Sequence, residues 1–383
     1  MAKKVCLIGP AYPYRGGIAA FTERLARAFM ANGYQVSIFT FYLQYPKIFF
    51  PGKTQFSNEP FPHDLDIRRT VNSINPFSWY VTANEISKIS PDLVIINYWL
   101  PYIAPALGSI ARLVRNKKNF NTLAIPHNIK PHEKKIGDLA LSKYFVNSVD
   151  GFLPMSGSVV DDLKEINDQK PHVLSPHPLY DHYKGGKDKL SAREEMDLDR
   201  DTKYLLFFGL IRDYKGLDLL IRAMSFLKNR VKNLKLIVAG EFYSNSDKYL
   251  ELIDDLGLKQ HILLNAEFIP DSKVGLYFSV ADLIVQPYKS ATQSGVTQIA
   301  YHFNKPMIVT NVGGLSELVP DGKVGYVVNP DEKSISDAIY RFFKEGKESE
   351  FVENIKEEKK KYSWTTLMEN IERLDKKVKE IKN

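Results

Sequence analysis

Short apolar runs alternate with amphipathic stretches along almost the whole of this 383-residue chain. Residues 5–8 and 36–41 have the composition of buried strands, and the apolar residues between Ile18 and Phe29 recur with the period of a helix. A helix between two such strands is typical of a parallel sheet covered by helices. The alternation therefore predicts an α/β protein built from βαβ units.

The alternation breaks once, in a polar and charge-rich stretch between residues 184 and 203. We therefore predict two doubly wound, Rossmann-like domains, residues 1–185 and residues 186–362. The last segment, residues 363–383, carries an apolar stripe at helical spacing and is expected to form a helix that packs on another part of the chain. Beyond the break, strand-like runs return at residues 204–208, 234–239, 262–264, 283–285, 307–309 and 326–328.

Composition narrows the class of protein. Apolar residues make up 44% of the chain, enough to fill two cores and to exclude a disordered or fibrous protein. The single cysteine, Cys6, excludes an intramolecular disulfide framework and a cysteine-based zinc site. Residues 1–189 hold 23 Lys and Arg against 15 Asp and Glu, whereas the remainder holds 29 against 30. This basic first half either attracts an anionic partner (nucleic acid, acidic lipid or a phosphorylated substrate) or is a plain solvated surface.

No segment has the pattern of a signal peptide or a membrane span. The apolar run at residues 5–8 is too short for a signal-peptide core, and the longer run at residues 93–111 is interrupted by Pro101 and Pro105. We therefore expect a cytoplasmic protein, acting free in the cytoplasm or at the inner face of the membrane. The basic first half is the part that would make such a peripheral contact.

Three glycine-containing turns follow predicted strands, at the edge where doubly wound sheets bind their ligands. Gly16 and Gly17 precede the first helix, Gly209 follows the strand at residues 204–208, and Ser294 and Gly295 open a later helix. Glycine lets the backbone approach a ligand closely, and a helix N-terminus attracts an anion. The alternative for each is an ordinary tight turn or helix cap.

Polar side chains accompany these turns. Arg212 and Lys215 would suit a diphosphate beside a helix N-terminus, or they are exposed basic residues on a loop. His127 follows a predicted strand at the same kind of edge, where it either faces a ligand or is a buried structural histidine. Gln298, one turn into the helix after Ser294, could reach a ribose.

No residues have the spacing of a metal site. The histidines form no helical i, i+4 pair, and the two Asp-x-Asp triplets, at residues 64–66 and 197–199, do not closely follow an apolar strand. We therefore expect no metal. The loop at residues 41–62 combines aromatic residues and prolines with Lys47 and Lys53. It is either a loop that binds the acceptor or a lipid interface, or a surface loop that packs on itself.

The order and spacing of these residues resemble the retaining nucleotide-sugar glycosyltransferases of family 4, over nearly the whole chain. Gly16-Gly17 matches that family's N-terminal glycine loop, and His127 matches its active-site histidine. Arg212 and Lys215 match the cations that hold the donor diphosphate, and Trp364 resembles the tryptophan that begins the terminal helix. The resemblance implies the GT-B fold, with two Rossmann-like domains facing across a cleft and a C-terminal helix crossing back to the first domain.

The same resemblance implies a function. A hexose would move, with retention, from a UDP- or GDP-linked sugar to a glycan or lipid-linked acceptor in surface polysaccharide or glycoconjugate synthesis, without a further cofactor. The catalytic residues would be His127, Arg212 and Lys215. The donor-binding residues would be Gly16, Gly17, Gly209, Glu241, Phe268, Ile269, Thr292, Gln293, Ser294, Gly295, Val296 and Gln298.

One family feature is absent, and alternatives follow from it. The Glu-x7-Glu motif is missing, and Gln298 is the nearest polar side chain to its second glutamate. A non-catalytic sugar-nucleotide-binding module is therefore one alternative. A sugar-nucleotide 2-epimerase of the same fold is another, but it needs ionisable groups for proton transfer, and residues 294–298 offer none. No nucleic-acid partner is expected, because no recognised nucleic-acid-binding motif is present.

Overall fold

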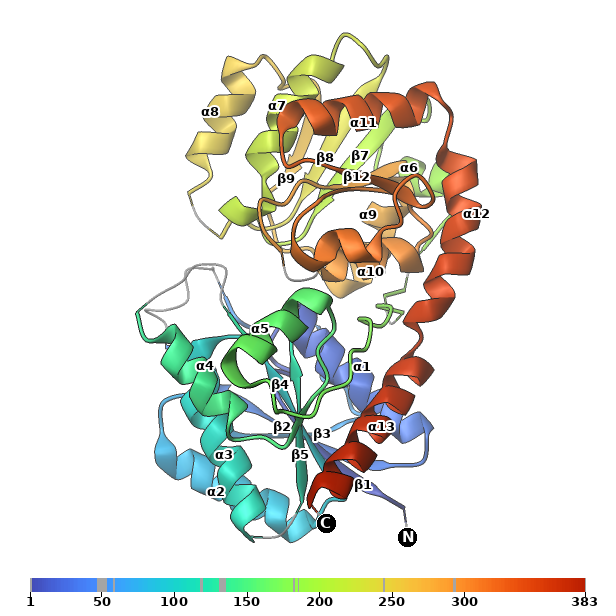
Figure 1. Cartoon of the computed structure of the whole chain (residues 1–383). Coiled ribbons are helices and arrows are strands. Elements are labelled where there is room, and N and C mark those ends of the chain that lie inside the picture. The colour runs from blue at the N-terminus through green and yellow to red at the C-terminus, as the bar shows by residue number, and fades with distance from the viewer. Residues whose placement is uncertain are drawn as a thin grey trace. The chain divides into compact units, whose positions relative to one another are not determined.

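The computed structural model describes residues 2–46, 54–57, 59–117, 120–130, 136–181, 183–184, 186–243, 245–291 and 294–382. The chain divides into two compact units (Figure 1). The N-terminal unit comprises Met1–Pro178 and Tyr362–Asn383, and the C-terminal unit comprises Leu179–Lys361. The first division thus lies a few residues before position 185, and the terminal helix belongs to the N-terminal unit.

A six-stranded parallel sheet forms the centre of the N-terminal unit, in the order β3-β2-β1-β4-β5-β6. Its central strands are apolar along nearly their whole length, because helices cover both faces of the sheet. The strands are β1 (Lys4–Ile8), β2 (Gln35–Leu43), β3 (Asp66–Asn72), β4 (Leu93–Tyr98), β5 (Asn121–Pro126) and β6 (Gly151–Phe152).

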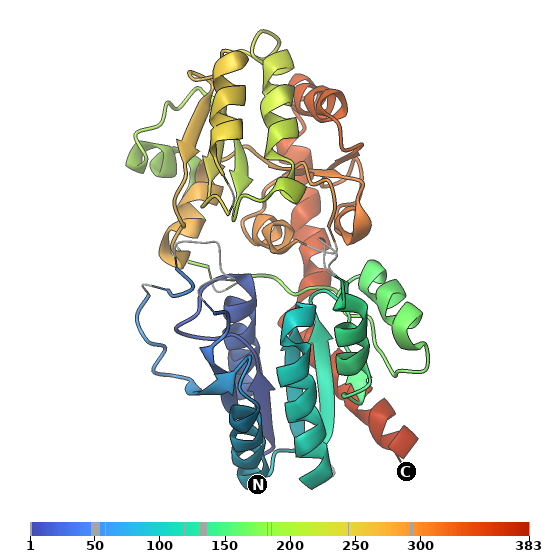
Figure 2. The same cartoon turned by 90° about the vertical axis from the view of Figure 1, so that its left-hand side faces the viewer.

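Helices form two groups around this sheet (Figures 1 and 2). Four of them contact one another in series: α2 (Pro76–Ile89), α3 (Ala104–Lys117), α4 (Asp138–Val146) and α5 (Gly157–Asn167). The other two, α1 (Gly17–Ala31) and α13 (Trp364–Lys382), contact each other, and α13 also contacts β5 and β6. The apolar stripe of α13, which includes Trp364, is buried in these contacts.

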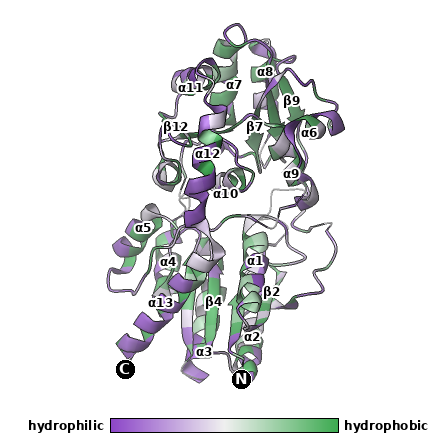
Figure 3. Cartoon of the chain, turned by 90° about the vertical axis from the view of Figure 1, so that its right-hand side faces the viewer, coloured by the Kyte–Doolittle hydropathy of each residue, from purple (hydrophilic) through white to green (hydrophobic). Residues whose placement is uncertain are grey.

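The C-terminal unit repeats the plan with a six-stranded parallel sheet in the order β12-β11-β10-β7-β8-β9. Its strands are β7 (Lys203–Phe208), β8 (Leu234–Ala239), β9 (Ile262–Asn265), β10 (Leu283–Gln286), β11 (Met307–Thr310) and β12 (Gly325–Val328). Its helices are α6 (Lys189–Glu195), α7 (Leu217–Leu227), α8 (Asp247–Asp255), α9 (Asp271–Val280), α10 (Gly295–His302), α11 (Glu332–Lys344) and α12 (Glu348–Glu358). Strands β4 and β7 are strongly hydrophobic, while α12 and α13 each carry a hydrophilic face (Figure 3).

Each sheet has a topological switch point, which lies between two neighbouring strands from which the chain continues toward opposite edges of the sheet. It lies between β1 and β4 in the N-terminal unit, and between β7 and β10 in the C-terminal unit. Ligands of such sheets bind outside the carboxyl ends of the strands at this point. The expectation of two Rossmann-like α/β units is confirmed, and the strand order now shows where in each a ligand site should be sought.

Candidate active site

The loop after β1 lies against the end of β4, at the switch point of the N-terminal unit. A Cβ atom on Gly9 would come within 3.0 Å of the Asn97 Cβ, so only glycine permits this approach comfortably. The N–H of Ala11 donates to the Thr40 Oγ1 at 3.0 Å and holds the loop against β2. The loop ends at Gly16, whose φ of +107° favours glycine.

Gly16 and Gly17 therefore lie where the sequence predicted them, at the start of α1. Gly16 is the N-cap residue, and Gly17 is the first residue of the helix. Gly16 has no side chain with which to cap the helix, and the first turn of α1 holds no acidic residue. The positive end of the α1 dipole thus points to the carboxyl edge of the sheet.

His127 follows β5 and joins a hydrogen-bond chain that fixes its protonation pattern. The hydroxyl of Thr22 donates to the Ile18 carbonyl at 2.8 Å, so its oxygen accepts from the Asn97 Nδ2 at 3.0 Å. The Asn97 Oδ1 is then the acceptor that faces the His127 Nε2 at 3.1 Å. Nε2 consequently carries the proton, and Nδ1 has the lone pair.

The surroundings keep this imidazole neutral. Burial, together with the neighbouring His177, lowers the pKa of His127 to about 3. The ring of Phe21 meets it edge-on, with centroids 5.2 Å apart, and also contacts His177 and Trp364. A neutral imidazole held this firmly can orient a hydroxyl group, but it is a poor proton donor at neutral pH.

Close backbone contacts define the second switch point, in the C-terminal unit. A Cβ atom on Gly216 would lie 1.9 Å from the carbonyl oxygen of Pro287, so the loop after β7 presses directly on the loop after β10. A Cβ atom on Gly240 would lie 2.0 Å from the carbonyl oxygen of Gly209. Glycines at these positions allow three chain segments to meet at one edge of the sheet.

Lys215 is held at this meeting point. Its Nζ would lie 3.2 Å from a Cβ on Gly209, and it lies 5.6 Å from the centroid of the Tyr288 ring. Loss of hydration, with repulsion from Arg212, lowers the pKa of Lys215 to about 8. Arg212 lies nearby with its guanidinium 4.5 Å from the Tyr243 ring centroid. The two cations are thus close enough to repel each other.

The N-terminus of α10 lies beside this lysine. Ser294 is the N-cap residue, but its Oγ lies 3.3 Å from the Tyr288 hydroxyl and makes no capping hydrogen bond to the helix. A Cβ atom on Gly295 would come within 2.8 Å of the Tyr180 ring, which accounts for glycine there. Val296 reaches to 3.9 Å from a Cβ placed on Gly209. The structure therefore brings Gly209, Lys215 and residues 294–296 together.

The side chain of Gln298 is buried without any hydrogen bond to the described residues. It is fully buried on α10, and neither its amide nitrogen nor its oxygen has a hydrogen-bond partner among the described residues. The Nε2 of Gln286, at the end of β10, is in the same state, although its Oε1 accepts from Thr297. Such orphaned groups are rare in native interiors and destabilise the empty protein.

The other expected donor-binding residues are more dispersed. Glu241 is buried directly after β8, and its carbonyl accepts from the N–H of Ile211. Phe268 and Ile269 follow β9, two strands away from β7, so they share the sheet edge with the cations without joining them. Thr292 and Gln293 lie outside the described residues.

Within the described ranges, no group of three or more His, Cys, Asp or Glu side chains is placed to hold a metal ion. No helix in the described part of the chain combines the length and hydropathy needed to cross a membrane.

Sequence reasoning missed Asn97 and the structural role of Tyr288. Asn97 orients His127, and the signal for it was a single amide in an otherwise apolar strand, residues 93–98. Tyr288 packs against Lys215 and contacts Ser294, and it follows β10 at the switch point. The strand order was needed to see either role.

Two sequence families cover most of the chain. The family model described as Glycosyltransferase Family 4 matches residues 15–178. The one described as Glycosyl transferases group 1 matches residues 188–362. The two matches coincide closely with the two structural units.

A curated relative and two solved structures illustrate the likeness. The chain is 25% identical over 262 residues to a D-inositol 3-phosphate glycosyltransferase of Corynebacterium aurimucosum, with 63% of this chain and 61% of that protein covered. The match thus spans about three fifths of that relative's length. The sucrose-phosphate synthase of Thermosynechococcus elongatus superposes with a TM-score of 0.77, at 18% identity over 98% of this chain and 99% of that one.

The second structure is the Anabaena protein HepE in complex with UDP-glucose, with a TM-score of 0.73 at 13% identity over 99% of this chain and 98% of that one. At such low identities the similarity of these structures supports only the fold, which is the GT-B fold. Together with the two family matches and the glycine turns, histidine and cations at the switch points, they confirm the resemblance found in the sequence: the chain belongs to the family 4, group 1 glycosyltransferases.

Proposed function

We propose that this protein is a retaining glycosyltransferase that moves a hexose from a nucleotide-diphosphate sugar to a glycan or lipid-linked acceptor. The observation that carries the proposal is the switch point of the C-terminal unit. There, Lys215 lies beside the N-terminus of α10, which the Ser294 side chain does not cap, and next to Gly209, whose φ of +96° favours glycine. Loss of hydration lowers the pKa of Lys215, and a bound anion would stabilise its charged form.

The diphosphate of the donor is the anion that these groups suit. Lys215, Arg212 and the α10 dipole would neutralise the charge that develops on the departing diphosphate, without a metal ion. Preorganised groups of this kind contribute about 2–4 kcal/mol each to the transition state of related reactions. The leaving phosphate oxygen would then take the proton of the attacking acceptor hydroxyl.

His127 would position the sugar rather than transfer a proton. Its pKa of about 3 leaves it neutral at physiological pH, and the Asn97 Oδ1 fixes the proton on Nε2. The Nδ1 atom is then an acceptor suited to a sugar hydroxyl. An oxocarbenium-like transition state, stabilised by the donor's own phosphate, needs no carboxylate nucleophile from the protein.

The relatives support the donor class. HepE binds UDP-glucose, and the C. aurimucosum relative is named for a phosphorylated polyol acceptor. We therefore propose a UDP- or GDP-linked sugar as donor, with UDP the first to test, and no additional cofactor. The buried amide of Gln298, which has no hydrogen-bond partner among the described residues, is proposed to contact the ribose after a local rearrangement, in place of the glutamate usual in the family.

We also propose that the acceptor is a lipid-linked molecule of a surface polysaccharide or glycoconjugate, met at the inner face of the membrane. The N-terminal unit holds 25 Lys and Arg against 17 Asp and Glu. Exposed apolar residues follow its strands at the carboxyl edge, among them Ile74, Phe77 and Leu139. Basic charge with exposed aromatic and aliphatic side chains favours a lipid interface.

Turnover of a labelled donor tests the proposed reaction. UDP-glucose, UDP-galactose and GDP-mannose, each labelled in the sugar, are incubated with the protein, a bacterial polar lipid extract and EDTA. We expect one donor to give a labelled lipid whose anomeric configuration matches that of the donor, as NMR of the purified product would show. Inversion would refute the retaining mechanism. Donor binding without any turnover on lipid or glycan acceptors would instead favour a non-catalytic binding module.

A vesicle experiment tests the membrane contact separately. We expect co-sedimentation with vesicles that contain acidic phospholipid, lost in the variant Phe77→Ser but kept in Phe226→Ser, an exposed phenylalanine of the C-terminal unit. Full release from acidic vesicles at low salt would contradict the contact.

A further inference from the structure

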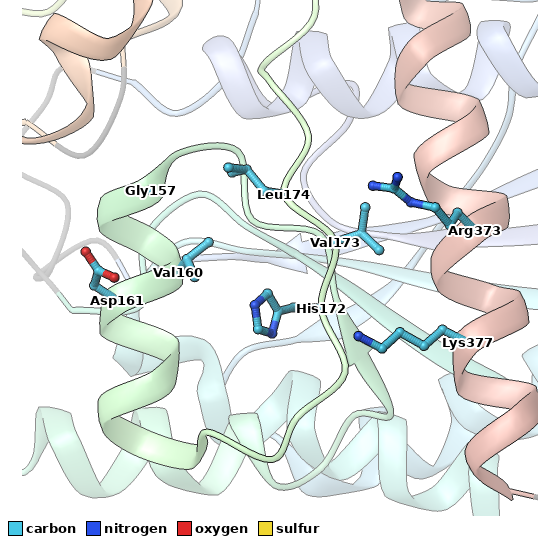
Figure 4. Close-up of a pocket in the computed structure, with 8 residues that line it drawn as sticks. All are labelled: Gly157, Val160, Asp161, His172, Val173, Leu174, Arg373 and Lys377. Carbon is cyan, nitrogen blue, oxygen red and sulfur yellow. The ribbon is translucent and has the colours of Figure 1, made fainter.

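An open edge of the N-terminal sheet lies in a groove between two helices. The groove has a volume of about 490 Å³. On one side are Gly157, Val160 and Asp161 of α5, on the other are Arg373 and Lys377 of α13, and residues 172–174 run between them (Figure 4). It lies away from the switch point, on the far side of β6, and has no part in the function proposed above.

Residues 171–175 act as an additional strand beside β6. The N–H of Phe152 donates to the Pro171 carbonyl at 2.9 Å, and the N–H of Val173 donates to the Phe152 carbonyl at 3.0 Å. Ser175 continues the pattern by donating to the Pro154 carbonyl at 3.0 Å. Residues 171, 173 and 175 therefore turn their main-chain polar groups toward β6.

The intervening residues turn theirs the other way. In a parallel pair, successive residues direct N–H and C=O alternately to the two sides of a strand. His172 and Leu174 thus present these groups to the groove, and no main-chain hydrogen bond of either residue occurs within the described part of the chain. Unpaired groups of this kind are a template on which another extended chain can add as a strand.

The walls of the groove add a charge preference. Arg373 and Lys377 are four residues apart on α13 and so share a face of the helix. Neither makes an ion pair or hydrogen bond with a described residue, unlike Lys379, which binds Asp375 on the same helix. In Figure 4 both cations extend from α13 toward residues 172–174, whereas Asp161, the one acid among the described residues that line the groove, lies on α5 at the opposite wall.

Apolar groups complete the surface. Val160 and Val173 are almost fully buried at the base of the groove, and the side chain of Leu174 is 49% exposed. A strand that added here would place alternate side chains against this apolar surface and toward α13. The groove thus combines an unpaired sheet edge, an apolar floor and two uncompensated positive charges.

We propose that this groove binds an extended, acidic segment of a partner protein, which adds to the sheet as a strand next to residues 171–175. Main-chain hydrogen bonds to His172 and Leu174 would fix the backbone. Glutamate or aspartate side chains of the segment would pair with Arg373 and Lys377. The unpaired main chain favours a peptide over a small anion, because a phosphate or carboxylate alone would leave that sheet edge unused.

Fluorescence anisotropy with labelled octapeptides tests the proposal on the full chain. The probe alternates valine with glutamate, and one control replaces every glutamate by lysine. A second control keeps the glutamates but carries N-methyl groups on alternate amides, so that it cannot pair as a strand. We expect saturable binding of the acidic probe, weakened about tenfold or more in both control peptides.

Matched protein variants locate the binding. Lys377→Glu should weaken the acidic probe about tenfold, while Lys376→Glu, the neighbouring exposed lysine outside the groove, should change it less than about twofold. Leu174→Pro removes an outward N–H without touching a bond to β6, and it should also weaken binding. Far-UV circular dichroism checks that each variant is folded.

Two outcomes would overturn the proposal. The first is the absence of saturation with the acidic probe up to about 1 mM. The second is equal binding of the acidic probe and its N-methylated form, because the cations would then recognise an anion without any strand being added.

Discussion

Replacing Lys215 by methionine should stabilise the empty protein. Loss of hydration and repulsion from Arg212 lower the pKa of Lys215 from 10.5 to about 8. That difference corresponds to roughly 3 kcal/mol by which the charged lysine destabilises the folded state. Because the side chain keeps some contact with solvent, we expect about 1–2 kcal/mol to be recovered. Methionine has a similar length and no charge, so it should fill the same space.

Urea unfolding followed by far-UV circular dichroism measures this gain. The difference in stability between the variant and the wild type depends on pH. Below pH 8 the lysine is charged in both states and the full difference between variant and wild type is present. Between pH 8 and 10.5 the folded lysine becomes neutral while the unfolded one stays charged, so wild-type stability rises and the difference disappears.

Two controls make the result specific. Lys215→Arg keeps the charge and should gain little, and Lys232→Met removes an exposed lysine of the same unit and should change stability by less than about 0.5 kcal/mol. The reasoning would be refuted if Lys215→Met destabilised the protein at pH 7, or if its gain did not shrink at higher pH.

Three further predictions concern the surroundings of the site. Burial lowers the pKa of His127 to about 3 and that of His177 to about 4. In the unfolded chain these histidines take up a proton near pH 6.5. The free energy of unfolding of the N-terminal unit should therefore fall by about 2 kcal/mol per histidine between pH 7.5 and 5. Tryptophan emission in urea follows this loss, because all three tryptophans belong to that unit, and His177→Gln should remove half of it. Gly216→Ala should destabilise the C-terminal unit by about 3 kcal/mol or more. Gly257→Ala, at a similar positive φ but with its Cβ meeting only the flexible Lys228 Nζ at 3.9 Å, should cost only about 1 kcal/mol. Equal losses would refute the close approach to Pro287. Gln298→Leu should raise the stability of the protein without nucleotide by about 1 kcal/mol, because it removes two buried atoms that have no hydrogen-bond partner in the described part of the chain, while weakening UDP binding in calorimetry.

Much of the fold could be predicted from periodicity alone. The apolar runs at residues 204–208 and 234–239 became β7 and β8, and the glycines at 16 and 17 begin α1. Strand β3 was missed, because Arg68 and Arg69 interrupt its apolar pattern. At the edge of the sheet next to β2, this strand is partly exposed and tolerates such residues.

The candidate site was predictable in its charges but not in its supporting contacts. Lys215 and Arg212 stand out in a loop between an apolar strand and a helix. The roles of Asn97 and Gly240 depend on which strands are neighbours, and the order β1-β4 and β7-β8 is not written in any short stretch of sequence. Long-range register decides these contacts, so sequence motifs alone could not reveal them.

Calorimetry with UDP, GDP and ADP in the presence of EDTA tests the central claim most directly. We expect UDP or GDP to bind the wild-type protein with EDTA present. Lys215→Met should weaken this binding at least about tenfold, whereas Lys232→Met should leave it unchanged. Equal binding to Lys215→Met and wild type, or no binding of any nucleotide to wild type, would contradict a donor diphosphate site at the switch point of the C-terminal unit.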